Sequence, residues 1–524
     1  MLERAIEDWL TKTVERNYLP AFCQVLIHQD HKVLYLSLHG QMERGKDLAT
    51  IGPDGSYYAY QTKTGDINKA SWRDIRGELQ ELIEFPIDHP SVDKRKRHRA
   101  YLVTNGTISE PVRLDITEMN EQNRRLRRKW AKLEVIDRFQ LLAMFVEAQK
   151  KFFPRELPDM RAFLDLYLHN GRDLLPKQQL FSLLDATTFS MRPKKKSDAL
   201  DALTGAVVLG SYLLGAFEKE RNWFALIEGW CAIAVSIARF ALRYQIKESQ
   251  WKPSFDLVFS EVERNVMELR AEAAGRSHFL EVPVELDGDG LLRARTTIVL
   301  GLICWSEMRQ STGPAWQSDR GSAKQILQKH AANLIFWGES AFPFFFYVIR
   351  FLEADGEAQE AKRILCDLFV ALVESNYKNR QGGFLPPYYD AEQVLGEQIP
   401  DQLRVPPPTP AGSSYIIGTL LDMLLRRGYD DVIKKSWRKY THCQQYEFAP
   451  TNEWDLFAWR ASIGNNLSSF PEPTATLPDL RAEAVRIMQG TELQRKFECL
   501  LGLYLMVCPF RATRSAVGYL DWSR

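Results

Sequence analysis

Residues 45–63 read GKDLATIGPDGSYYAYQTK, and this stretch decides the fold of the first part of the chain. Segments 47–51 and 56–63 within it are rich in β-branched and aromatic residues, which suits them to a pleated sheet. The intervening sequence GPDG is a strong turn signal. We therefore predict an antiparallel hairpin with a two-residue loop, Asp54-Gly55.

The predicted register brings polar side chains together at the open end of this hairpin. A two-residue loop places Asp47 opposite Thr62, and therefore beside Gln61 and Lys63. Strand alternation puts Gln61 and Lys63 on one face. Phosphodiester hydrolysis uses such groups, because a carboxylate and neighbouring oxygens hold Mg²⁺ or Mn²⁺, while a lysine orients the attacking water or neutralises the transition state.

The flanking segments complete a small mixed α/β domain covered by helices. Helical spacing of apolar residues alternates with short apolar runs that are typical of strands. Ser71 is a plausible N-cap of one helix. The predicted elements are helices over 2–28, 71–84, 109–130 and 138–150, and strands over 32–38, 100–104 and 132–136.

The order Gly45-Lys46-Asp47, then Tyr60-Gln61-Thr62-Lys63, resembles the PD-(D/E)xK nuclease superfamily. It is most similar to the Mrr-like branch, in which glutamine often replaces the middle acid. The resemblance covers roughly residues 1–145. It implies a restriction-endonuclease-like fold and a Mg²⁺- or Mn²⁺-dependent DNA endonuclease, with Asp47, Gln61 and Lys63 catalytic and the first two also metal ligands.

Members of this family often add a glutamate from the first helix. Glu15 fits that role as a further catalytic residue and metal ligand, because it precedes the apolar stretch 19–26. Glu7 and Glu43 remain alternatives. The resemblance also implies an effector of bacterial defence against phage, since Mrr-like domains are joined to large regulatory regions in such proteins.

Two other classes of function remain open. In a purely structural interpretation, Asp47 caps a loop, and Gln61 and Lys63 are ordinary residues of an edge strand. Glutamine in place of an acid also removes negative charge and weakens cation binding. The alternatives are therefore a catalytically silent nucleic-acid-binding protein and a helical protein-interaction scaffold.

Two basic runs lie in the same part of the chain. Phosphate contacts supply most non-specific affinity for nucleic acids, so these runs are candidates to contact the DNA backbone, although charge runs are more often simply solvated. The candidate residues are Lys94, Arg95, Lys96, Arg97, Arg124, Arg125 and Arg128.

Long apolar helical patterns dominate after residue 150, which predicts an all-α, helical-repeat-like region. We expect a nuclease domain over 1–150, a helical connector with a basic loop over 151–198, and a helical regulatory or interaction region over 199–524. That last region would bind a partner protein or self-associate. The apolar stretches 202–217 and 334–352 are read as buried helices, because neither is a clean span of about 20 apolar residues.

Composition and charge fit a cytoplasmic globular protein. Hydrophobic residues make up 45% and charged residues 26%, and the formal net charge of +1 gives no argument about a polyanionic partner. Seven scattered cysteines predict neither a zinc site nor a disulfide framework. The amphipathic, acid-containing start predicts no export. The sequence contains no GxxxxGK[ST] loop and no GxSxG elbow.

Overall fold

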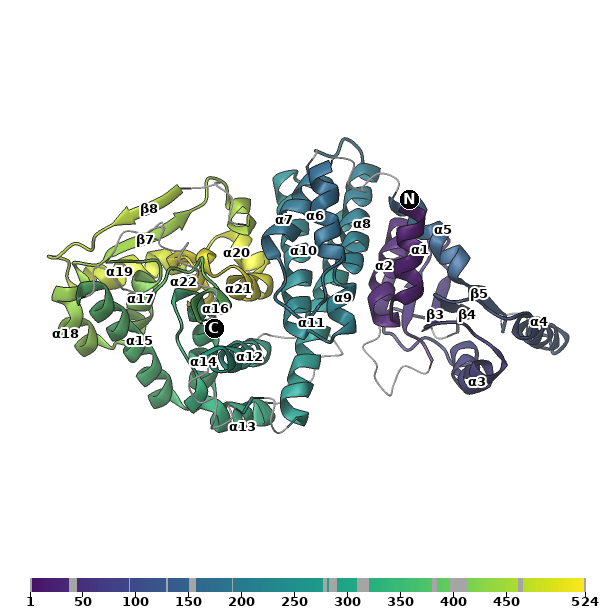
Figure 1. The fold of residues 1–524 in the computed structure, drawn as a ribbon, viewed down its shortest axis with the longest axis horizontal. Coiled ribbons are helices and arrows are strands. Elements are labelled where there is room, and N and C mark those ends of the chain that lie inside the picture. Colours follow the sequence, from purple (N-terminus) through teal and green to yellow (C-terminus); the bar gives the residue numbers. More distant parts are fainter. Residues whose placement is uncertain are drawn as a thin grey trace. The chain divides into compact units, whose positions relative to one another are not determined.

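The chain divides into two compact units, residues 1–265 and 266–524, which are described separately (Figure 1). The predicted boundaries at residues 150 and 198 both fall inside the first unit. The computed structural model describes residues 2–36, 45–93, 95–128, 131–149, 157–190, 192–276, 280–281, 290–308, 320–378, 384–395, 412–459 and 465–522.

A five-stranded mixed sheet in the order β1-β2-β3-β4-β5 forms the centre of the α/β part. Strands β1, β2 and β3 are antiparallel neighbours, whereas β4 and β5 run parallel to β3. The mixed α/β fold predicted for this region is therefore confirmed. The strands are β1 (Lys32–Leu36), β2 (Leu48–Ile51), β3 (Tyr57–Lys63), β4 (His98–Thr104) and β5 (Leu133–Ile136).

The β2–β3 hairpin has a three-residue loop, so the predicted two-residue loop was wrong. Gly52 donates its N–H to the carbonyl of Ser56 at 2.9 Å, which closes the loop around Pro53, Asp54 and Gly55. Gly55 has φ +73°, the left-handed conformation that such loops require. Leu48 consequently pairs with Tyr60, and the same register places Asp47 opposite Gln61 instead of Thr62.

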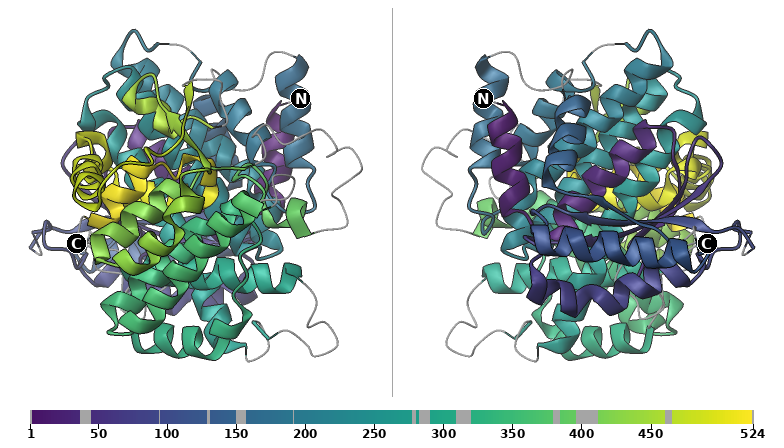
Figure 2. Two further views of the ribbon diagram at one scale, coloured as in Figure 1. Left: turned by 90° about the vertical axis from the view of Figure 1, so that its left-hand side faces the viewer. Right: turned by 90° about the vertical axis from the view of Figure 1, so that its right-hand side faces the viewer.

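Helices α3 (Lys69–Glu84) and α4 (Glu110–Arg125) cover one face of this sheet (Figure 2, right). Their apolar residues pack on the odd-numbered strand positions of β3 and the even-numbered positions of β4. The N-cap of α3 is Asn68, whose side chain accepts N–H bonds, and not the predicted Ser71. Ser71 instead completes the capping box as its N3 residue.

The opposite face is covered by α1 (Leu2–Lys12), α2 (Glu15–His28) and α5 (Arg138–Gln149). Helix α2 contacts β1 and β3 on one side and α8 (Lys196–Leu213) on the other. Every residue from Asn17 to Ile27 is buried, because neither side of the helix faces solvent. Polar contacts join α2 to α8, with Gln24 Nε2 3.2 Å from Thr204 Oγ1 and His28 Nε2 2.8 Å from Asp201 Oδ1.

The remaining helices of the first unit stack behind α8. Among them, Arg264 forms a buried ion cluster with Glu218 at 3.2 Å and Glu261 at 2.7 Å. These helices are α6 (Leu157–Tyr167), α7 (Lys177–Thr187), α9 (Gly215–Lys219), α10 (Trp223–Arg243) and α11 (Glu248–Gly275), the last of which crosses the boundary between the units.

The second unit is largely helical. Its helices are α12 (Gly290–Met308), α13 (Arg320–His330), α14 (Phe342–Ala354), α15 (Ala358–Lys378), α16 (Ala391–Leu395), α17 (Ile417–Arg427), α18 (Asp430–Tyr440), α19 (Leu477–Met488), α20 (Glu492–Lys496), α21 (Glu498–Val507) and α22 (Arg514–Trp522). Short 3₁₀ turns lie at η2 (Ala331–Asn333), η3 (Glu339–Ala341), η5 (Glu453–Phe457) and η6 (Pro509–Arg511).

A small sheet in this unit corrects the expectation of an all-α region. It contains β6 (Ser413–Ser414), β7 (Gln444–Ala449) and β8 (Asn465–Ser469), in that order. These strands are short, and β6 and β8 are polar and lack the β-branched and aromatic enrichment by which strands are recognised.

The apolar stretches are buried in the protein. Residues 202–213 lie in α8 and residues 342–352 in α14, and all of them are buried. Over the described residues, α10 is the one helix long and apolar enough to cross a membrane, and 94% of its apolar window is buried inside the structure.

We predict that residues 1–150 do not fold alone, whereas residues 1–276 do. A chain ending at 150 would expose the side of α2 that packs on α8, and a large exposed apolar patch promotes aggregation. Both fragments can be compared by solubility and by thermal unfolding. A soluble 1–150 fragment with a cooperative transition would show that α8 is not needed for the α/β part to fold.

Candidate active site

The candidate residues lie where β3 ends and β2 begins. Asp47 immediately precedes β2, and Glu15 is the first residue of α2. Gln61 and Lys63 lie in the last three residues of β3. Helix α2 packs on β3 through contacts such as Phe22 with Tyr60, whose ring centroids are 5.4 Å apart. The start of α2 is thereby placed over the end of β3.

Thr62 joins the two carboxyl groups of the site. Its backbone N–H donates to Asp47 Oδ2 at 2.6 Å, and its hydroxyl oxygen lies 2.8 Å from the same atom. The hydroxyl also contacts Glu15 Oε1. A hydroxyl has one proton, so it cannot donate to both carboxylates at once. The arrangement is satisfied when Glu15 is protonated and donates to Thr62, which then donates to Asp47.

The pKa of Glu15 agrees with this proton assignment. Burial, followed by the negative charge of Asp47, raises the pKa of Glu15 to about 7, although the positive charge of Lys63 lowers it. Tyr18, one turn further along α2, donates its hydroxyl to the carbonyl of Lys63 at 2.8 Å. Burial and the two nearby carboxylates raise the pKa of Tyr18 as well, so this hydroxyl acts as a donor.

Gln61 and Lys63 point to the other face of the sheet, toward α3. The Lys63 ammonium lies 2.6 Å from Glu78 Oε2. Gln61 is only 5% exposed, and its Oε1 has no hydrogen-bond partner among the described residues. The structure therefore brings Glu15 and Asp47 into one cluster, with the charge of Lys63 acting on Glu15, while Gln61 lies beside them without a contact to either carboxylate.

These donors can be compared with the ligand preferences of Mg²⁺. Within the described ranges, no group of three or more His, Cys, Asp and Glu side chains is placed to hold a metal ion. Mg²⁺ keeps several waters and is bound by one or two carboxylates, so a two-carboxylate site suits it. Glu15 and Asp47 meet at the Thr62 hydroxyl and supply two carboxylates once Glu15 has lost its proton, so these two residues fit a divalent cation.

Asn105 links the segments that carry the site. It is 2% exposed, and its Nδ2 donates to the carbonyls of Leu10 at 2.7 Å and Thr13 at 2.9 Å, just before Glu15. Its Oδ1 accepts the N–H of Gly65 at 2.7 Å, just after Lys63. One side chain thus fixes the start of α2 relative to the end of β3.

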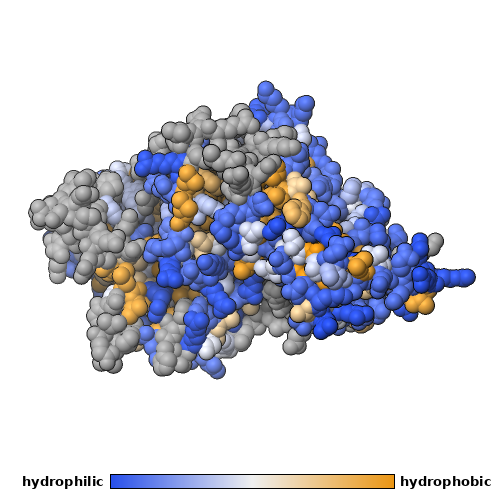
Figure 3. Space-filling model, turned by 45° about the vertical axis from the view of Figure 1, so that its right-hand side comes forward, coloured by the Kyte–Doolittle hydropathy of each residue, from blue (hydrophilic) through white to orange (hydrophobic). Residues whose placement is uncertain are grey.

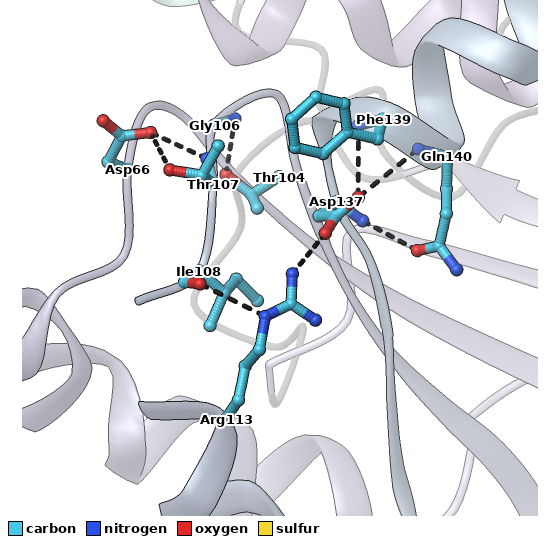
Figure 4. A network of polar contacts seen from close by, with 9 residues as sticks. All are labelled: Asp66, Thr104, Gly106, Thr107, Ile108, Arg113, Asp137, Phe139 and Gln140. Atoms are coloured by element: carbon cyan, nitrogen blue, oxygen red, sulfur yellow. Dashed lines mark hydrogen bonds and ion pairs between the residues drawn. The ribbon is translucent and has the colours of Figure 1, made fainter. Parts of the chain in front are cut away.

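The loops after β3, β4 and β5 are joined by a further polar network (Figure 4). Asp66 Oδ1 accepts the N–H of Thr107 at 2.7 Å and its hydroxyl at 2.8 Å. Arg113 Nη2 donates to Asp137 Oδ2 at 2.5 Å. Gly106 lies against the backbone of Gly65, where a Cβ would come within 2.1 Å of it. These contacts hold the sheet edge that contains the site.

The basic candidates lie at the opposite end of the strands. Lys94 is outside the described residues, as is Glu43 among the alternative acids, and Glu7 is partly buried on α1. The described basic candidates lie just before β4, at the end of α4 or just after it, so they lie near the start of β3, since β3, β4 and β5 are parallel. They are Arg95, Lys96, Arg97, Arg124, Arg125 and Arg128, and all are exposed.

Several residues of the site were not predicted. Thr62 is the unspecified middle position of the Gln-x-Lys pattern, and Asn105 follows the strand predicted over 100–104. Tyr18 and Glu78 reach the site from helices that are distant in sequence. Only the position of Thr62, between two predicted site residues, could have drawn attention to it. No family model, curated protein or solved structure matches this chain.

Glu15→Gln is expected to stabilise the metal-free protein above neutral pH. The pKa of Glu15 in the folded protein, about 7, lies above its ordinary value of 4.5. Its contribution to stability is therefore complete below about pH 4.5 and is lost as the pH rises through about 7. In EDTA at about pH 8, the variant should gain roughly 1–3 kcal/mol in free energy of unfolding over wild type.

Chemical denaturation at about pH 5 and about pH 8 measures this difference, which should shrink at the lower pH. Glu7→Gln, the same acid-to-amide change on α1, is the matched control. An equal effect of Glu15→Gln at both pH values would contradict the proton assignment.

Asn105→Ala should destabilise the protein by about 2–4 kcal/mol, because it leaves the N–H of Gly65 and two carbonyls without their partner. Denaturant unfolding gives the free energy. The control is Asn123→Ala, which removes a bond to the carbonyl of Ala131 at a partly buried position. If both substitutions cost the same, Asn105 does not hold the two segments together.

Proposed function

We propose that the protein is a metal-dependent DNA endonuclease whose centre contains Glu15, Asp47, Gln61 and Lys63. The observation that carries this proposal is the meeting of the Glu15 and Asp47 carboxyl groups at the Thr62 hydroxyl, with the charge of Lys63 acting on Glu15. Paired acids beside an ammonium group suit the binding of a cation and a phosphate diester together.

Each side chain has a separate task in this proposal. Asp47 and Glu15 would hold Mg²⁺ or Mn²⁺, and Gln61, whose side chain points toward α3, would have to rotate to join them as the predicted third ligand. When bound, the cation supplies an activated water and stabilises negative charge on the phosphate. Lys63 would donate to the attacking water or to a phosphate oxygen, and Glu78, 2.6 Å away, positions its ammonium group.

The order of elements supports the restriction-endonuclease-like fold within this proposal. Two helices precede three antiparallel strands, and a third helix leads to a strand parallel to the third strand. Asp47 and the Gln-x-Lys pattern lie at adjacent strand ends, where the Mrr-like resemblance requires them. We further propose that residues 199–524 form a helical-repeat-like region that regulates the nuclease or binds a partner, and that the protein acts in the cytoplasm in defence against phage.

Cleavage of plasmid and linear DNA tests the proposal directly. Full-length protein should cut with Mg²⁺ or Mn²⁺ and not with EDTA. Asp47→Ala and Lys63→Ala should each reduce cutting by about 10²-fold or more, because each removes a charge at the reacting phosphate. Asp115→Ala and Lys69→Ala are matched controls, since these residues form an ion pair 2.6 Å long between α3 and α4.

Two results would overturn the assignment. Cutting that survives both site substitutions would place the active centre elsewhere. DNA binding without any metal-dependent product would favour the catalytically silent binding protein. A helical scaffold would instead bind a protein partner equally well after Asp47→Ala.

A further inference from the structure

The two basic runs converge on one residue of the fold. Arg97 Nη1 donates to the carbonyl of Glu84 at 3.4 Å, and Arg128 Nη1 lies 3.8 Å from the Glu84 carboxylate. Glu84 is the last residue of α3. The stretch before β4 and the turn after α4 are therefore neighbours, and we call this surface, Arg95–Arg97 with Arg124–Arg128, the basic end of the sheet.

The basic end and the candidate active site lie at opposite ends of β3. Tyr57, the first residue of β3, pairs with His98, and Lys63, the last, pairs with Thr104. Six steps along a strand span about 20 Å. DNA rises 3.4 Å per base pair, so about six base pairs separate the two surfaces along a duplex whose axis runs parallel to β3.

Charge at the basic end suits a polyanion. Each basic residue there is exposed, and cations outnumber the acids that contact them. The recorded acidic partners, Asp93, Glu84 and Glu121, lie 2.9–3.9 Å from the guanidinium groups. Exposed pairs of this kind are worth little, so phosphates can replace the acids at small cost. Figure 3 shows a largely hydrophilic surface toward the side on which α3 and α4 lie in Figure 1.

The backbone of Arg127 gives a second observation. Its φ is +58°, and Arg128 donates its N–H back to the carbonyl of Asn123 at 2.8 Å. This is the left-handed position that closes a helix, where glycine is preferred. An exposed arginine is held there in spite of the backbone cost, and an outlier of this kind is a reason to look for a function of the side chain.

We propose that the basic end binds the phosphate backbone of duplex DNA about 20 Å from the Asp47 carboxylate. This inference rests on the proposed nuclease function and adds a condition to it. A duplex must extend about six base pairs past the cut, on the side of the basic end, to occupy both surfaces.

Binding of a fluorescent duplex of about 24 base pairs, measured by anisotropy in EDTA, tests DNA binding by the basic end without cleavage. Arg124→Glu/Arg125→Glu should weaken binding by about tenfold or more at low salt and reduce the salt dependence. The matched control is Lys434→Glu/Lys435→Glu, an exposed pair on α18 in the second unit with the same change of charge. The control should bind as wild type does.

Arg127→Gly separates a binding role from a structural one. Glycine suits φ +58°, so the thermal midpoint should stay equal or rise. Binding should nevertheless weaken, and the slope of log K against log salt should fall by about 1 if one phosphate contact is lost. Wild-type binding and slope in both this variant and the double variant would overturn the proposal.

End-labelled duplexes test the distance. Wild-type protein should not cut within about six base pairs of one end, and the double variant should lose this limit along with its affinity. The two proposals fail separately. If the protein does not cut DNA but its binding depends on the basic end, only the nuclease proposal is rejected. If cleavage depends on Asp47 but the variants of the basic end bind as wild type does, only the proposal for the basic end is rejected.

Discussion

Helix α2 is buried on both sides, and the geometry of the candidate site depends on that burial. Residues 17–27 have no solvent-facing side, because β1 and β3 lie against one side and α8 against the other. Close packing on two sides leaves the helix little room to shift or rotate. Glu15 is the first residue of α2, so these contacts and the hydrogen bonds of Asn105 fix its position.

The candidate site brings the carboxyl groups of Glu15 and Asp47 together, which is unfavourable when both are charged. Two carboxyl groups share one hydroxyl in a largely buried place, and the proton held by Glu15 relieves their repulsion. A cation would relieve it in the same way, so a metal ion at this site would compete with the proton. The raised pKa therefore fits a centre in which charge is balanced by a ligand, and it would be costly in a purely structural cluster.

Much of the α/β part could be predicted from sequence, because its strands are apolar or aromatic and its helices show clear periodicity. Asp47, Gln61 and Lys63 were located at the correct strand ends. The pairing of Asp47 was wrong by one residue, since loop length sets register and GPDG is compatible with loops of two or three residues. Asn105, Glu78 and the polar sheet of the second unit depend on tertiary contacts or short strands, for which local pattern carries little signal.

The double burial of α2 also has a genetic consequence. Substitutions that enlarge Thr204, whose hydroxyl contacts Gln24 of α2, would displace α2 and with it the Glu15 carboxylate. For the proposed nuclease, a selection for inactive alleles would then recover substitutions at codon 204, far in sequence from the 45–63 motif. Substitutions that abolish activity would thus map to α8 as well as to the residues proposed to perform the chemistry.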